Sequence, residues 1–341
     1  MKRIKDLVCR VVAGVAMLFA LMPQAWAEDA LKVAVARRGV WESALAELGQ
    51  QAGVFKKHGI VLDLVYLEGS SETRQSVVSN RADIGLAVDA MAAMHDYAFG
   101  APIRIIAASM AGSANYWYVL KSSPIQTLNE VAGKTIAYEA NGLSSHYDAL
   151  DFLKQFRLKA KLVVTGRADA TFAQLKSGRV DLAWAAAPFG IDEVEQGNLR
   201  VIARANDIRL TRNKTTRVMI TNADTLQKRK DVLIRFLQAY RETVEWMYSD
   251  PAALNRYAEF AGVSEGVARR LRDEFYTKDM LSPDKIVSVR TIVRDAVAQR
   301  YLSKRLSRKQ LRDLVQIATP ASGDQVGCEF ASAACPIGLT P

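Results

Sequence analysis

The clearest chemistry lies in Gly142, Ser144, Ser145 and His146, which follow an apolar stretch and open a helical pattern that continues to about Phe156. The first turn of a helix offers unpaired backbone N–H groups and a partial positive charge, and serine hydroxyls add donors. This combination suits an oxyanion. Ser144 can instead cap its own helix, worth about 1 kcal/mol, and capping does not exclude ligand contact. For His146 we expect structural or ligand hydrogen bonds, because no nucleophile or paired base is in view.

Two aspartates occupy matching places in a repeated segment. Residues 79–87 (SNRADIGLA) recur as residues 177–185 (SGRVDLAWA), and Asp83 and Asp181 stand at the same position in each copy. A pair of carboxylates can serve acid–base catalysis, but a repeated position between a helix end and a strand favours a structural role, binding local backbone N–H groups. Each copy leads into an apolar run typical of a strand buried in a parallel sheet. The repeat predicts two similar lobes with a cleft between them.

The order of the elements agrees with two α/β lobes. Strand and helix patterns alternate from Leu31, which predicts mostly parallel sheets covered by helices on both faces. A strand at 115–120 leaves the first lobe and one at 216–221 returns to it. From Leu226 the pattern is helical, and these helices are expected to wrap the first lobe; they fall at 226–248, 251–260, 265–275, 283–301 and 308–317. We assign the domains as follows: lobe 1, residues 28–120 and 217–320; lobe 2, residues 121–216; C-terminal tail, residues 321–341.

The two ends of the chain carry the signals that indicate the cellular compartment of the protein. Residues 1–27 combine a basic start, an apolar stretch at 11–22 and the small-residue site Ala25-Trp26-Ala27, which predicts a cleaved secretory signal. The apolar stretch is shorter than the roughly 20 residues of a spanning helix. We therefore expect export to the periplasm. In that oxidising compartment Cys328 and Cys335 can close a short loop in the tail, although the sequence leaves their pairing open.

Charge and motif content exclude several classes of function. The formal net charge is +10, but the basic residues are spread along helices rather than gathered in a stripe, so we expect no nucleic acid partner. The chain has three histidines, His58, His95 and His146, far apart in sequence. It has no His-x-x-x-His, no Cys-x-x-Cys and no glycine-rich phosphate loop. We expect no metal, no cofactor and no catalytic residue.

Four segments carry a resemblance to a known family. They are residues 53–60 (GVFKKHGI), 81–85 (RADIG), 142–147 (GLSSHY) and 178–183 (GRVDLA). They resemble the periplasmic solute-binding proteins of ABC transporters, in the group that binds aliphatic sulfonates, taurine, nitrate and thiamine-pyrimidine precursors. The resemblance implies an α/β, two-lobed, type II fold whose lobes are joined by two crossing hinge segments and close over a ligand. Residues 186–188 are Ala-Ala-Pro where many members have Trp-Asp-Pro, so we expect a larger or differently polar ligand.

Ligands of open parallel sheets bind at the carboxyl ends of strands, and this rule selects further candidates. With the helix entrance already described, the predicted ligand contacts are Trp41, Ser70, Asp89, Asn115, Gly142, Ser144, Ser145, His146, Trp184 and Arg217. Trp41 and Trp184 would form apolar walls, with core packing as the alternative for both. Asp89 stands where the family places a polar residue toward the ligand; it can instead cap the next helix.

The favoured function is a monomeric periplasmic receptor that captures a small organic solute and delivers it to an ABC permease of the inner membrane. A sulfonate- or carboxylate-like anion is favoured by the helix N-terminus and by Arg37 or Arg38. A pyrimidine-like or other heteroaromatic solute is the alternative, favoured by Trp41, Asp89 and Glu68. An enzyme similar to the fungal thiamine-pyrimidine synthases is disfavoured by the export signal and the lack of a cysteine-rich motif. A sensor lobe of a membrane kinase is disfavoured because no spanning or output segment follows the lobes.

Overall fold

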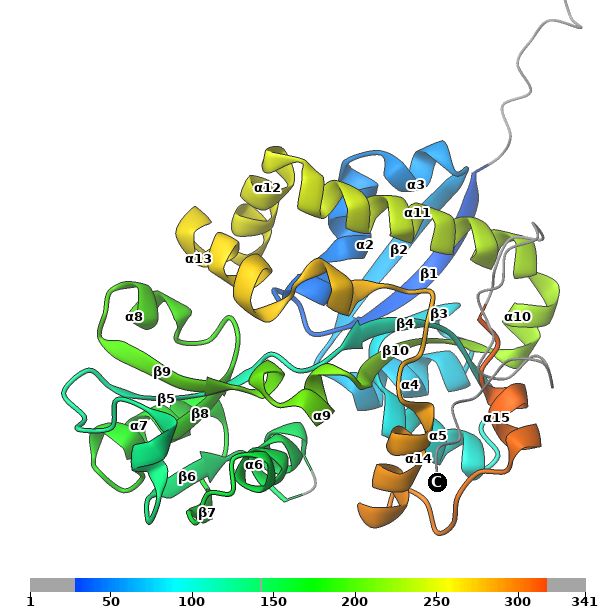
Figure 1. Ribbon diagram of the computed structural model, residues 1–341. Helices are drawn as coiled ribbons and strands as arrows, with labels where there is room; N and C mark the ends of the chain where they lie inside the picture. Colours follow the sequence, from blue (N-terminus) through cyan, green and yellow to red (C-terminus); the bar gives the residue numbers. More distant parts are fainter. Residues whose placement is uncertain (1–27, 142, 318–341) are drawn as a thin grey trace, which may run out of the picture.

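The chain folds into two α/β lobes (Figure 1). The computed structural model describes residues 28–141 and 143–317. The predicted signal segment, Gly142, Cys328 and Cys335 lie outside the described residues. Lobe 1 occupies the top and the right-hand side of Figure 1, and lobe 2 the lower left. Within the described residues, no helix has the length and apolar character that a membrane span requires.

Lobe 1 is built on a five-stranded sheet in the order β2-β1-β3-β10-β4. β1 pairs in parallel with β2 and β3, whereas β10 lies antiparallel between β3 and β4. The predicted parallel arrangement therefore holds except for the strand that returns from lobe 2. The elements of this lobe are β1 (Asp29–Ala36), α2 (Trp41–Gln51), α3 (Val54–Lys57), β2 (Ile60–Leu67), α4 (Ser70–Val78), β3 (Ile84–Asp89), α5 (Ala90–Ala98), β4 (Ile103–Ala111) and β10 (Thr215–Asn222).

Lobe 2 repeats this arrangement. Its elements are β5 (Asn115–Leu120), a 3₁₀ turn (Leu128–Val131), β6 (Thr135–Tyr138), α6 (Ser144–Gln155), β7 (Lys161–Val164), α7 (Ala168–Lys176), β8 (Ala183–Ala186), α8 (Ile191–Glu195) and β9 (Leu199–Arg204). β5 lies antiparallel between β8 and β9, and β6 pairs in parallel with β7. A parallel bridge between Ile136 and Leu182 places β6 beside β8. The order β7-β6-β8-β5-β9 matches that of lobe 1, so the predicted duplication is confirmed.

The two repeated aspartates have the same structural role in both lobes. The Oδ2 atom of Asp83 accepts a hydrogen bond from the backbone N–H of Lys32 at 2.8 Å. The Oδ2 atom of Asp181 accepts one from the backbone N–H of Thr135 at 2.8 Å and another from its hydroxyl at 2.7 Å. Each carboxylate thus fastens the segment before the third strand of its lobe to the first strand. The predicted structural role is confirmed.

Two segments cross between the lobes, residues 112–114 after β4 and residues 205–214 before β10. The second contains the short helix α9 (Arg209–Arg212). The strand Asn115–Leu120 pairs with β8 and β9 and belongs to lobe 2, so our sequence-based assignment of residues up to 120 to lobe 1 is wrong in this part. Its apolar pattern identifies a strand but carries no information about which sheet the strand joins.

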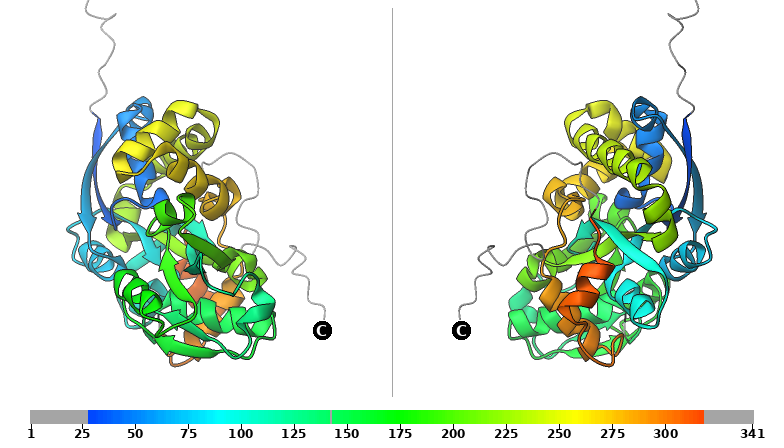
Figure 2. Two further views of the ribbon diagram at one scale, coloured as in Figure 1. Left: turned by 90° about the vertical axis from the view of Figure 1, so that its left-hand side faces the viewer. Right: turned by 90° about the vertical axis from the view of Figure 1, so that its right-hand side faces the viewer.

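The C-terminal helices surround lobe 1 (Figure 2): α10–α13 lie around its upper part, and α14 and α15 below its sheet. These helices are α10 (Ala223–Lys228), α11 (Lys230–Ser249), α12 (Pro251–Ala261), α13 (Glu265–Arg270), α14 (Val289–Ala298) and α15 (Arg308–Leu314). The predicted helix at 283–301 begins only at Val289. The carbonyls of Pro283 and Val287 accept hydrogen bonds from Ala108 of β4 and Thr215 of β10, so this segment bonds to the sheet instead of forming helical turns.

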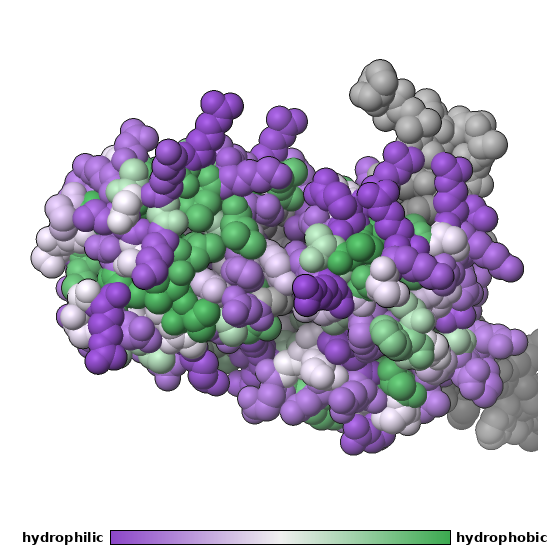
Figure 3. Space-filling view, turned by 90° about the horizontal axis from the view of Figure 1, so that it is seen from below, coloured by the Kyte–Doolittle hydropathy of each residue, from purple (hydrophilic) through white to green (hydrophobic). Residues whose placement is uncertain are grey.

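The lower face of lobe 2 is partly apolar. Figure 3, seen from below, shows an apolar area on the side of the molecule where lobe 2 lies. Exposed apolar side chains of this lobe include Leu150 of α6 and Val164 of β7, at 44% and 49% exposure. Neither residue lines the cavity between the lobes described below.

Candidate ligand site between the lobes

A cavity of about 720 Å³ lies between the two lobes. Lobe 1 lines it with the ends of β1 and β3 and the first residues of α4 and α5; lobe 2 lines it with the end of β8 and the first turn of α6. Both crossing segments also contribute. The carboxyl ends of strands and the amino ends of helices from both lobes thus meet at one cavity, as in other open α/β sheets. Its volume falls within the range of small-molecule sites, about 300–1,000 Å³.

Six of the ten residues predicted to contact a ligand line this cavity. They are Ser70, Asp89, Asn115, Ser144, Trp184 and Arg217. They come from segments spread over almost 150 positions of the sequence, and the topology brings them together. Three other predicted residues do not line it, and Gly142 lies outside the described residues.

The three remaining residues have structural contacts. Trp41 is completely buried in lobe 1, with its ring centroid 4.4 Å from that of Tyr257, so it packs in the core rather than forming a cavity wall. Ser145 is also completely buried, and its Oγ atom accepts a hydrogen bond from the backbone N–H of Glu139 at 3.0 Å. The ring of His146 stacks on Tyr138 with centroids 4.6 Å apart, and burial lowers the pKa of this histidine.

The lobe 1 wall contains a set of polar side chains that bind one another. Asp89 caps α5 through a 2.9 Å hydrogen bond from the backbone N–H of Ala92, and its second carboxylate oxygen pairs with Arg217 at 2.9 Å. Capping, the alternative considered for Asp89, is therefore present in the structure. The Oγ atom of Ser70 accepts hydrogen bonds from the Asp89 N–H at 2.9 Å and from Arg74 at 3.1 Å. Its own hydroxyl hydrogen remains available as a donor.

The lobe 2 wall is the entrance of α6. Leu143 is the N-cap residue and provides no side-chain cap, so the first N–H groups of this helix are not bound by a capping side chain. Ser144 is the first helical residue, and its Oγ atom accepts a hydrogen bond from the Asn115 amide at 3.3 Å. Asn115 also donates to Asp148 Oδ2 at 2.8 Å, and Ser113 donates to the same atom at 2.7 Å. Asp148 thereby connects α6 to the first crossing segment.

Asp148 and Lys214 are charged cavity residues that sequence reasoning missed. Asp148 is 6% exposed; burial raises its pKa, while the hydrogen bonds from Ser113 and Asn115 oppose the rise. Lys214, in the second crossing segment, pairs with Asp295 of α14 at 3.0 Å. The available signal for Asp148 was its place one helical turn after Ser144, on the same face of α6.

Two further charged residues lie near the start of α2. The guanidinium of Arg37 lines the cavity and forms no hydrogen bond or ion pair with another described residue, although it lies near enough to Glu42 to lower the pKa of that carboxyl. Glu42 is 8% exposed and lines the same wall, and its Oε2 atom has no partner in the part of the chain that the structure describes. Burial raises the pKa of Glu42, against the opposing effects of its own backbone N–H, of Arg217, of the Tyr276 hydroxyl and of Arg37. Arg38 lies elsewhere, 4.3 Å from the ring centroid of Phe260.

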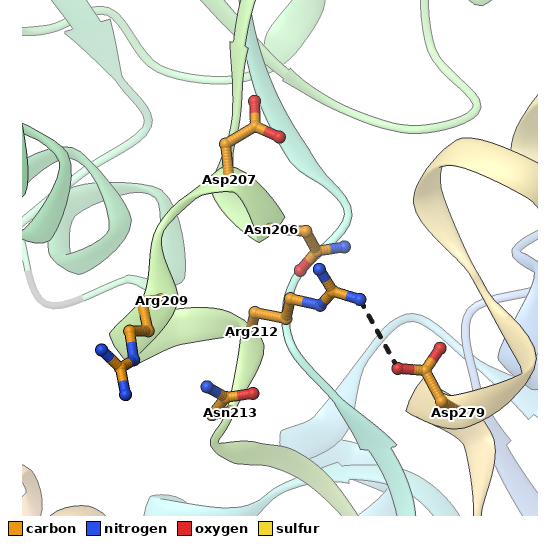
Figure 4. Close-up of a pocket in the computed structure, with 6 residues that line it drawn as sticks. All are labelled: Asn206, Asp207, Arg209, Arg212, Asn213 and Asp279. Carbon is orange, nitrogen blue, oxygen red and sulfur yellow. Dashed lines mark ion pairs between the residues drawn. The ribbon is translucent and has the colours of Figure 1, made fainter.

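A smaller hollow of about 380 Å³ lies at the second crossing segment (Figure 4). Arg212 forms a 3.8 Å ion pair with Asp279 across it. Arg209 points away from that pair, so the two arginines do not converge on one place. This arrangement fits a contact between the crossing segment and lobe 1 better than a ligand site.

Comparison with known proteins identifies both a sequence family and a fold. The profile of the family described as NMT1/THI5 like matches residues 44–254. The comparison with curated proteins gave no match. Among solved structures, the periplasmic aliphatic sulphonate binding protein SsuA of Escherichia coli is similar, with a TM-score of 0.65 and 19% identity over 87% of this chain and 94% of that one.

Two further structures share this fold. The sulfonate-binding protein SsuA of Methylobacillus flagellatus KT, described as putative, has a TM-score of 0.66 and 18% identity, over 85% of this chain and 92% of that chain. The desulfurization enzyme DSZB has a TM-score of 0.63 and 16% identity, over 85% of this chain and 96% of that chain. At such identities the similarity establishes the two-lobed fold of the periplasmic binding proteins, a fold that also occurs in an enzyme.

Proposed function

The chain belongs to the NMT1/THI5-like family, and on this premise we propose that it binds a small organic acid, a sulfonate or a carboxylate, in the cavity between its lobes. In this proposal it is the periplasmic receptor of an ABC importer. The observation that carries the proposal is the guanidinium of Arg37, which lines a cavity between the two lobes and has no hydrogen-bond or ion-pair partner in the part of the chain that the structure describes. An acidic solute would supply the missing partner.

The other charges of the cavity support this role for Arg37. Arg74 pairs with Asp96 at 2.6 Å, Lys214 with Asp295 at 3.0 Å and Arg217 with Asp89 at 2.9 Å. These three cations are therefore neutralised within the protein. Helices α2 and α6 both begin at the cavity without a side-chain cap and add partial positive charge. An acidic group between these two helix entrances would be held by Arg37 and by backbone and Ser144 donors.

The remaining wall suits the organic part of such a solute. Apolar side chains line much of the cavity, and these are Val40, Met91, Met110, Leu143, Trp184, Phe189 and Ile292. The indole N–H of Trp184 already donates to the Gly166 carbonyl at 3.2 Å, so this side chain offers its ring surface only. Ala186, Ala187 and Pro188 line the same wall. Small side chains at 186 and 187 leave room for a bulkier body.

The heteroaromatic alternative has less support. It relied on Trp41, Asp89 and Glu68. Trp41 lies in the core, and Glu68 is not among the described residues that line the cavity. The two carboxylate oxygens of Asp89 bind Ala92 and Arg217. A ring nitrogen would have to displace one of these contacts. The acidic solute requires no such exchange.

We propose binding without chemical conversion. Among the described residues that line the cavity there is neither a cysteine nor a histidine, two side chains that commonly serve as nucleophile and base. The described serines that line it are Ser70, Ser113 and Ser144, and their hydrogen bonds join them to Asp, Asn and Arg side chains and to backbone N–H groups. Ser113 donates to the carboxylate of Asp148 at 2.7 Å, but the same oxygen also accepts from Asn115 at 2.8 Å, so this carboxylate holds α6 to the first crossing segment.

The proposed location and partner follow from the receptor role. The predicted signal at 1–27 would direct the protein to the periplasm, and closure of the lobes over the solute would create the shape that an inner-membrane ABC permease recognises. The protein would act as a monomer. The two crossing segments, residues 112–114 and 205–214, would accommodate the closure.

Thermal unfolding with a panel of solutes tests this function. Alkane sulfonates and carboxylates should raise the melting temperature in proportion to the logarithm of their concentration, and mass spectrometry should recover them unchanged. Arg37→Ala should abolish most of the shift, and the matched control Arg38→Ala should retain it. Stabilisation by neutral or heteroaromatic solutes alone, or turnover of the solute, would contradict the proposal.

A further inference from the structure

Glu42 is a buried side chain of the cavity wall whose hydrogen bonding is incomplete among the described residues, and the Oε1 atom of Gln299, which also lines the cavity, is a second such atom. It is the second residue of α2, it lines the cavity, and it is 8% exposed. Its Oε2 atom has no partner among the described residues. A buried polar atom without a partner costs free energy, because water is lost and nothing replaces it. Such an atom in a binding cavity calls for an explanation.

The groups next to the Glu42 carboxyl do not supply the hydrogen bond that its Oε2 atom lacks among the described residues. Arg217 is bound to Asp89 at 2.9 Å. The hydroxyl of Tyr276 lies close to the carboxyl but donates its hydrogen to the Ala187 carbonyl at 3.2 Å. A hydroxyl has only one hydrogen to donate. Arg37 lies near enough to lower the pKa of Glu42 but forms no ion pair with it. Among the described residues, Glu42 therefore keeps a buried oxygen with unused acceptor capacity.

The equivalent residue of lobe 2 shows a different use of the same place. Val33 and Ile136 have matching bridges to the third strand of their lobes. Eight residues after each, α2 and α6 begin, so Glu42 corresponds to Ser145. Ser145 is also buried, and the Glu139 N–H satisfies its hydroxyl oxygen. In lobe 2 the side chain at this position, Ser145, is hydrogen-bonded within the lobe. In lobe 1 the Oε2 atom of Glu42 has no hydrogen-bond partner among the described residues.

We infer that Glu42 is a specificity-determining residue that accepts a hydrogen bond from an N–H group of the bound solute. The solute then carries an amine, amide or ring N–H in addition to its acidic group. This inference rests on the proposed function and narrows it. Arg37 and the two helix entrances provide donors for the acidic group, and Glu42 provides the complementary acceptor for the N–H group.

Isothermal titration with matched probes tests the inference. The pairs are propanesulfonate with 3-aminopropanesulfonate, and benzenesulfonate with 3-aminobenzenesulfonate. Wild-type protein should bind the amino member of at least one pair about tenfold more tightly or better, since a hydrogen bond to a charged group is worth about 1.5–3 kcal/mol. Glu42→Gln should reduce this preference and Glu42→Met should abolish it.

The outcomes separate the two claims. Equal affinity for both members of each pair, or a preference that survives Glu42→Met, overturns the inference and leaves the proposed function standing. If wild-type protein binds none of the four probes, the proposed function fails for these sulfonates and the inference fails with it. Melting temperatures without solute add an independent check. Glu42→Met should leave the value unchanged or raise it, whereas a marked fall with both variants would show that the carboxyl holds the fold and overturn the inference.

Discussion

The carboxylate of Asp148 accepts a hydrogen bond from the side chain of Asn115 at 2.8 Å, inside the protein and next to the cavity. Asp148 belongs to α6 of lobe 2, and Asn115 immediately follows the first crossing segment. Thr211 of the second crossing segment lies 3.4 Å from the other carboxylate oxygen of Asp148. One side chain thus joins the helix at the ligand site to both connections between the lobes.

Replacement of Asp148 should therefore affect stability and binding together. Asp148→Ala leaves the buried donors of Ser113 and Asn115 without an acceptor, and we expect a loss of about 2 kcal/mol in the free energy of unfolding. Urea unfolding measures this loss. Asp148→Asn is the matched control, because it keeps the shape and one oxygen acceptor and should lose less. Equal stability of wild-type protein and Asp148→Ala would contradict this role.

The two serines at the start of α6, Ser144 and Ser145, should have different mutational effects, one on affinity and the other on stability. From sequence alone both were expected to contact the ligand, but Ser145 is buried and binds the Glu139 N–H. We expect Ser145→Ala to lower stability by about 1 kcal/mol, and Ser144→Ala to lower affinity for the solute with little change in stability. Thermal unfolding and titration calorimetry on both variants measure the two effects. The reverse assignment would show that the hydroxyl of Ser145 reaches the solute.

Small residues after β8 should set the size of the accepted solute. Ala186→Trp places a large ring in the cavity, so sulfonates with bulky bodies should lose at least about tenfold in affinity while short ones keep theirs. A solute series of increasing chain length, titrated against both proteins, measures this. Val164→Trp, on the exposed side of lobe 2, is the control and should bind the whole series like wild-type protein. A uniform loss across the series in Ala186→Trp would indicate misfolding rather than selection by size.

Asp181 should make stability depend on pH in the acid range. Burial tends to raise its pKa, but hydrogen bonds from the backbone and hydroxyl of Thr135 outweigh this and lower it below the ordinary value of 3.8. A carboxyl whose pKa is lower in the folded state stabilises the protein above its unfolded pKa, and this contribution is lost as the pH falls through the folded pKa. Urea unfolding between about pH 6 and pH 3 should show a smaller acid-dependent loss for Asp181→Asn than for wild-type protein. Identical pH profiles would contradict this.

Much of the fold could be predicted because its signals are local. The helix predicted at 251–260 is α12 (Pro251–Ala261), and the duplicated segments around Asp83 and Asp181 predicted two lobes of the same construction. The predictions of secondary structure and of lobe assignment were wrong where contacts with residues distant in sequence determine the structure. The segment 283–287 bonds to β4 and β10 across the chain, and β5 joins a sheet that its own residues do not specify.

Site residues could be predicted from the sequence where their place at the end of a strand brings them to the cavity. Ser70 and Asp89 lie just beyond or at the end of a parallel strand, Trp184 lies within β8, and all three line the cavity. Trp41 and Glu42 show the limit: both lie in the first turn of one helix, and the sequence period does not reveal that the tryptophan enters the core while its neighbour reaches the cavity wall.

A crystal structure of the protein with a stabilising alkane sulfonate tests the central claim most directly. The account predicts density for the solute between the starts of α2 and α6, with its acidic group within hydrogen-bonding distance of Arg37 and Ser144. Density for the solute on the outer surface of either lobe, or in the smaller hollow beside Arg212, would contradict it.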